Sequence, residues 1–152
     1  LIHKEYNMVT MSPKVADKTK ISTEDALNYM ISSRIVERVA DHAVSVARYM
    51  QMISEFEDPK LAVKIYEEGI KAKKIFSDSV ISLFSHDLKL ADSVIDESRT
   101  LSGKLEPLMK KVFKLPSDEA VLLAYVINSI ERIGAYGADI SKVTLNTFIQ
   151  KK

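Results

Sequence analysis

The chain has 152 residues and contains no cysteine and no tryptophan. The lack of cysteine excludes disulfides, thiol chemistry and cysteine-ligated zinc or iron–sulfur sites within this sequence. Only four glycines and four prolines interrupt it, which favours long helices over a turn-rich β fold. The longest apolar runs, such as residues 120–127, are too short to span a bilayer. These absences lead us to expect a cytoplasmic protein.

Neither sign of charge dominates, because the chain has 22 basic and 21 acidic residues and a net charge of +1. Bulk electrostatics therefore predict neither a nucleic-acid binder nor a strongly anionic surface. The sequence has no glycine-rich phosphate loop and no His-Glu-x-x-His pattern. The basic run of residues 71–74 is interpreted as a solvated helix face, with phosphate or nucleic-acid contact as the alternative.

Four long helical segments follow from capping signals and apolar periodicity. The first begins near Ser22, before Thr23-Glu24-Asp25, and ends near Phe56. The second opens at Asp58-Pro59, the third follows a break at residues 85–87, and the fourth runs from residues 115–119 towards Phe148. Pro107 should kink the third helix or restart it, because proline removes one backbone donor.

Apolar residues spaced three and four apart define the face that each helix is expected to bury. In the first helix the stripe comprises Leu27, Ile31, Val36, Val39, Ala40, Ala43, Val46, Ala47 and Met50. In the second it comprises Leu61, Ile65, Ile70, Ile75, Val80 and Phe84. Residues 120–127 are apolar almost all round and should be the most buried. Because short connections make neighbouring helices antiparallel, we expect an all-α antiparallel bundle of four long helices.

A short motif occurs twice. Residues 36–43 read Val-Glu-Arg-Val-Ala-Asp-His-Ala, and residues 130–137 read Ile-Glu-Arg-Ile-Gly-Ala-Tyr-Gly. The copies lie on the first and fourth helices and suggest a duplicated helical unit. Chance similarity between amphipathic helices is the alternative.

Glu37 and Asp41 in the first copy are four residues apart and so share a helix face. That face lies roughly 130° from the centre of the apolar stripe, so the pair should be accessible. Paired carboxylates suit a hard cation such as Mg²⁺, Mn²⁺, Ca²⁺ or iron. The alternative is a solvated pair neutralised by neighbouring arginines. Two acids are too few for a metal site, so further ligands would have to come from another helix or chain.

The motif resembles the hallmark of the PhoU family of phosphate-uptake regulators, Glu-Arg-x-x-Asp-His or Glu-Arg-x-x-Asp-Tyr. Residues 22–56 are similar to the last helix of one PhoU repeat, and residues 60–150 are similar to a complete second repeat. Residues 1–21 are similar to the end of the preceding helix and its loop, so we expect the chain to begin inside the first repeat, with a short N-terminal helical remnant. The resemblance is closest to archaeal-type members, which often carry an upstream AbrB-like DNA-binding domain.

The resemblance implies a regulatory adaptor that is not an enzyme, contacts a phosphate transporter or its signalling partner at the membrane, and forms a homodimer. It implies that Glu37, Asp41 and Glu131 are metal ligands, for iron or another divalent metal, and that Arg38 and Arg132 contact a partner. The second copy departs from the pattern, because Ala135 replaces the hallmark Asp and two usually acidic positions are Ser98 and Ser102. We therefore expect the second metal site to be absent or very weak.

Two other functions remain open at this point. The first is the regulatory domain of a transcription factor whose DNA-binding domain is not in this chain. The second is an enzyme with a carboxylate-bridged metal centre, which normally needs four or more inward-facing carboxylates with histidines. The single accessible acid pair argues against that enzyme.

Overall fold

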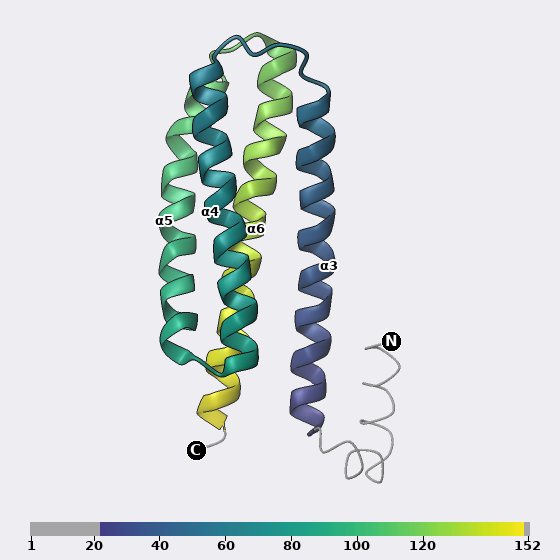
Figure 1. The fold of residues 1–152 in the computed structure, drawn as a ribbon, viewed down its shortest axis with the longest axis vertical. Helices are drawn as coiled ribbons and strands as arrows, with labels where there is room; N and C mark the ends of the chain where they lie inside the picture. Colours follow the sequence, from purple (N-terminus) through teal and green to yellow (C-terminus); the bar gives the residue numbers. More distant parts are fainter. Residues whose placement is uncertain (1–21, 151–152) are drawn as a thin grey trace.

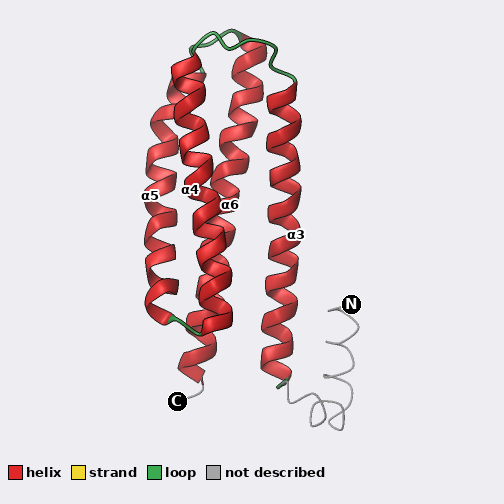
Figure 2. Ribbon diagram, viewed as in Figure 1, coloured by secondary structure: helices red, strands yellow, loops and turns green. Residues whose placement is uncertain are grey.

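The computed structural model describes residues 22–150, so the expected remnant at residues 1–21 lies outside the described part. Within that part there are four helices and no strand, which confirms the all-α prediction (Figure 2). The helices are α3 (Thr23–Gln51), α4 (Pro59–Ser85), α5 (Leu88–Val112) and α6 (Ser117–Gln150). Successive helices run in opposite directions along the molecule, as the short connections predict (Figure 1).

Side-chain caps fix the start of three helices. Ser22 Oγ accepts from the backbone N–H of Asp25 at 2.9 Å, and the Asp58 and Asp87 carboxylates each accept a backbone N–H at 3.0 Å. These bonds satisfy donors that lack a partner within the helix. At the end of α4, His86 takes a left-handed conformation with φ of 55°. The predicted starts at Ser22, Asp58 and Asp87 are therefore confirmed.

Helix α6 is central to the bundle. It packs against each of the other three helices, and α4 also packs against α5. Helix α3 has its main contact with α6 (Figure 1). The bundle is thus a compact three-helix unit, α4–α5–α6, with α3 laid along α6.

The core has two parts. The larger cluster lies within the α4–α5–α6 unit and includes Ile65, Ile75, Leu105, Leu123 and Ile127. The smaller cluster joins α3 to that unit through Ile35, Val39, Leu83 and Ile140.

Two glycines let α6 lie close to its neighbours. A Cβ at Gly134 would approach Leu101 Cδ2 of α5 to 2.6 Å. A Cβ at Gly137 would lie 3.0 Å from Ile75 Cγ2 and 3.2 Å from the Ile75 carbonyl oxygen of α4. Gly134 and Gly137, which both belong to the second motif copy, therefore allow close contact with α5 and α4, respectively.

The predicted core faces are partly wrong. Leu27, Ile31 and Val36 on α3 are 37–44% exposed, because α6 packs beside Ser32, Ile35 and Val39 instead. On α4, Ile70 and Phe84 are exposed, although Leu61, Ile65 and Ile75 are buried as expected. The buried run predicted at residues 120–127 is interrupted by two half-exposed side chains, Val121 and Tyr125.

One predicted boundary is wrong, and at Pro107 one of the two predicted alternatives is excluded. Helix α3 ends at Gln51 and not near Phe56, and the segment that follows is held to α6 by a bond of 3.3 Å from the Glu57 N–H to Glu119 Oε2. Helix α5 does not restart at Pro107 but continues through it. The carbonyl that Pro107 deprives of a donor belongs to Gly103, an exposed residue, so water can replace the missing donor.

Among the described residues, no helix combines the length and apolar character that crossing a membrane requires.

Candidate functional site

The two motif copies meet in the structure. His42 of α3 and Tyr136 of α6 occupy equivalent motif positions, and their ring centroids are 5.8 Å apart with planes tilted by 41°. Val39 of the first copy and Ile133 of the second belong to the same small core cluster. The helices that carry them run antiparallel (Figure 1). The copies are therefore related by a local two-fold axis that passes near the His42–Tyr136 contact.

Glu37, Arg38 and Asp41 are all exposed on α3, as their spacing predicts. The backbone carbonyl of Asp41 accepts from Ser45 Oγ at 2.9 Å, a bond within the same helix. The three charges form a hydrophilic face turned away from the small core cluster.

Glu131 has different surroundings from its equivalent, Glu37. It is half-buried, and Ser102 Oγ of α5 donates to Glu131 Oε1 at 2.6 Å. Ser98 also lies beside this copy, since its Oγ would be 3.8 Å from a Cβ at Gly134. Glu131 therefore faces α5, whereas Glu37 is on α3 with no helix covering it.

The three predicted metal ligands do not form a single cluster within the described residues. Glu131 is directed to α5, so the structure does not bring it to Glu37 and Asp41. Across residues 22–150, three or more acidic or histidine side chains nowhere gather as a metal site requires. Glu37 and Asp41 are exposed carboxylates on one helix. Further ligands would have to come from outside this helix, so a metal at this pair stays a prediction.

Arg38 and Arg132 are exposed and lie on either side of the ring contact. Each precedes its ring residue, His42 or Tyr136, by four positions and so shares a helix face with it. Because the helices are antiparallel, the Cα atom of Arg38 lies about 6 Å along the bundle from that of His42 in one direction, and the Cα atom of Arg132 lies as far from that of Tyr136 in the opposite direction. We call these four residues the motif surface.

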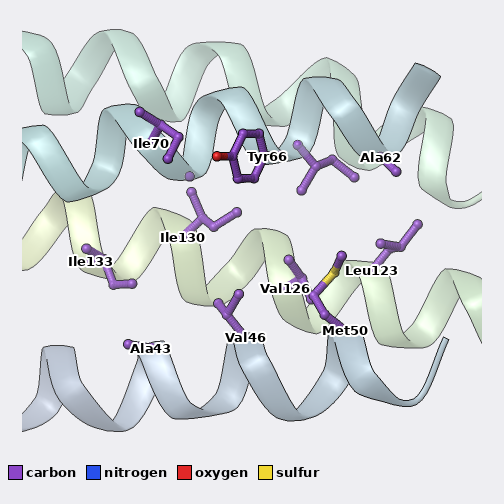
Figure 3. Close-up of a pocket in the computed structure, with 12 residues that line it drawn as sticks. Ala43, Val46, Met50, Ala62, Tyr66, Ile70, Leu123, Val126, Ile130 and Ile133 are labelled. Carbon is purple, nitrogen blue, oxygen red and sulfur yellow. The ribbon is translucent and has the colours of Figure 1, made fainter. Parts of the chain in front are cut away.

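The structure also contains an apolar groove that the sequence did not predict. It has a volume of about 270 Å³ and lies between α3 and α4, with α6 as its floor (Figure 3). The residues that line it are Ala43, Val46, Met50, Ala62, Ile65, Tyr66, Gly69, Ile70, Leu123, Val126, Ile130 and Ile133. Tyr66 supplies the one side-chain oxygen among them. Ile70 was expected in the core, but it is exposed at the rim of the groove. The periodicity of α4 shows that Ile70 is on the apolar side of the helix, but not that no other helix packs against it there.

The basic run at residues 71–74 is largely paired with acids. Lys71 Nζ lies 2.7 Å from Glu68 Oε1, and this hydrogen bond raises the pKa of Lys71. Lys74 Nζ lies 2.7 Å from Asp78 Oδ2, a hydrogen bond that, with the charge of Glu97, raises the pKa of Lys74. Local acids thus neutralise these lysines, in keeping with a solvated face.

No family model matches this chain, and no curated protein or solved structure matches it.

Proposed function

We propose that this protein is a regulatory adaptor of phosphate uptake, of the kind that the PhoU resemblance implies, and that it acts by binding a protein partner through the motif surface. The observation that carries the proposal is the meeting of the two motif copies at His42 and Tyr136. A motif that is duplicated in sequence and joined in space forms one continuous surface.

The chemistry of this surface favours an acidic partner. Arg38 and Arg132 present exposed guanidinium groups, which bind carboxylates through two parallel hydrogen bonds. The aromatic rings between them provide apolar contact area at low cost in conformational entropy. Glu37 and Asp41, on the adjoining part of α3, add negative charge that orients the partner and repels incorrect ones.

The partner proposed is the phosphate transporter or the signalling protein that reports on it, and a docked adaptor reduces uptake when phosphate is plentiful. No step of this proposal uses a metal.

The test is phosphate uptake in the source cell after deletion of the gene. We expect uptake in phosphate-rich medium to rise on deletion, and the wild-type gene to restore it to normal. The variant Arg38→Glu/Arg132→Glu should fail to restore it, because it repels an acidic partner. Lys110→Glu/Lys111→Glu is the matched control, since both lysines are exposed in the last turn of α5, away from the residues that contact the second motif copy.

Two results would contradict the proposal. Unchanged uptake after deletion would show that the protein does not regulate phosphate uptake. Full restoration by the doubly reversed variant would show that the motif surface is not where the partner binds.

A further inference from the structure

The basic run on α4 contains one lysine whose surroundings differ from those of its neighbours. Lys71 and Lys74 are paired with acids. Lys73 is exposed and forms no ion pair with any residue that the structure describes. It follows Gly69 by four positions and Ile70 by three, and both of these residues line the apolar groove. Because residues with these spacings are neighbours on a helix surface, Lys73 lies at the Ile70 end of the groove.

The hydroxyl of Tyr66 is a second polar group at this end. Figure 3 shows the hydroxyl directed toward Ile70, and therefore toward the end of the groove where Lys73 lies. The Tyr66 side chain is 67% exposed, and its hydroxyl has no hydrogen-bond partner within the described part of the chain. Tyr66 and Lys73 are about two helical turns apart, so they share a side of α4. One hydroxyl and one ammonium group are thus available as donors at the same end of the groove.

The rest of the groove is apolar and elongated. Apart from Tyr66, no lining residue has a side-chain oxygen or nitrogen. Figure 3 shows Ile70 and Ile133 at one end of the groove and Ala62 and Leu123 at the other. Eight residues of α4 separate Ala62 from Ile70, a rise of about 12 Å, which matches an extended alkyl chain of about ten carbons.

We propose that this groove binds a medium-chain fatty acid, with the alkyl chain lying along α6 and the carboxylate at Lys73 and Tyr66. An apolar cavity with a few polar groups that fix the orientation of the ligand is the usual form of a small-molecule site. Binding removes the alkyl chain and the apolar lining from water, which is the main source of affinity.

The charge at the Ile70 end favours a carboxylate as the head group. A carboxylate has one negative charge, which the single ammonium group of Lys73 neutralises. Its two oxygens accept from that ammonium group and from the Tyr66 hydroxyl. A doubly charged phosphate head group would leave one negative charge without a partner. The inference goes beyond the proposed function and does not rest on it, because no residue of the motif surface lines the groove.

The first test is isothermal titration calorimetry of the full chain with hexanoate, octanoate, decanoate and dodecanoate. We expect one molecule to bind per chain, with an affinity that rises about fourfold for each added methylene until the alkyl chain fills the groove. The affinity should level off near decanoate, because further carbons extend beyond the groove into water. The absence of saturable binding by all four acids would overturn the proposal.

The second test concerns the head group. Lys73→Gln should weaken the binding of decanoate about tenfold and leave the binding of decanol, which has no charge, unchanged. Lys64→Gln is the matched control, since Lys64 is exposed on the same helix and no residue three or four positions from it lines the groove. An equal loss of affinity for decanoate in both variants would contradict the assignment of the carboxylate to Lys73.

The third test locates the alkyl chain. Ala43→Leu fills the groove from the α3 side and should weaken the binding of decanoate and of decanol at least about tenfold. Circular dichroism verifies that the variant is folded, as expected for a substitution at an exposed residue. Unchanged binding by this variant would place the ligand outside the groove and overturn the proposal. An affinity that falls as the protein concentration rises would assign the groove to a second copy of the chain and overturn it equally.

Discussion

At the scale of single residues, Gly137 controls how closely α4 approaches α6. A Cβ there would lie 3.2 Å from the Ile75 carbonyl oxygen, which is backbone and cannot rotate away. Gly137→Ala should therefore lower the free energy of unfolding by about 1–2 kcal/mol, the cost of overpacking less the gain in helix propensity. Chemical denaturation monitored by circular dichroism measures the change.

Gly103 of α5 is the control for this prediction. A Cβ at Gly103 would meet no atom within 4 Å. Gly103→Ala should therefore raise the free energy of unfolding by about 0.5–1 kcal/mol, from helix propensity alone. If both variants gained stability equally, the close packing at Gly137 would be disproved.

The sequence predicted the surroundings of some candidate residues and not of others. The exposure of Glu37 and Asp41 follows from their angle to the apolar stripe of the same helix. The half-buried state of Glu131 does not, because it depends on α5 and on the hydrogen bond from Ser102. Contacts between residues far apart in the chain are not encoded in local periodicity.

At the scale of helices, the cap of α5 gives a second stability prediction. The Asp87 carboxylate accepts from the Leu90 N–H at 3.0 Å and satisfies a donor that the helix itself leaves unpaired. Asp87→Ala should lower the free energy of unfolding by about 1 kcal/mol. Asp92→Ala, at an exposed position of the same helix, should change it by less than about 0.5 kcal/mol. Equal effects in thermal unfolding would rule out the cap as the cause.

Helix starts were predictable because their signals are local, as at Ser22, Asp58 and Asp87. The buried side of α3 could not be predicted in this way, since its apolar stripe is wide enough for another helix to pack against either edge of it. The structure places α6 along Ile35 and Val39 and leaves Val36 and Ala40 exposed. A single sequence shows which side chains are apolar but not which of them find a partner.

At the scale of the whole molecule, the bundle joins two copies of one motif with unequal surroundings. The second copy lies within the α4–α5–α6 unit, whereas the first is carried by α3, which has its main contact with α6. This asymmetry leaves the first copy more exposed than the second. The repeated motif predicted a duplicated helical unit, and contact between the two motif copies became visible only in the fold.

The central claim is that the two motif copies touch, and nuclear Overhauser effects between ring protons test it most directly. The chain has three histidines, so a His42→Ala variant identifies the His42 resonances. With ring centroids 5.8 Å apart, we predict cross-peaks between the His42 and Tyr136 rings that disappear in that variant. Cross-peaks from the His42 ring to residues of α3 alone would contradict the account.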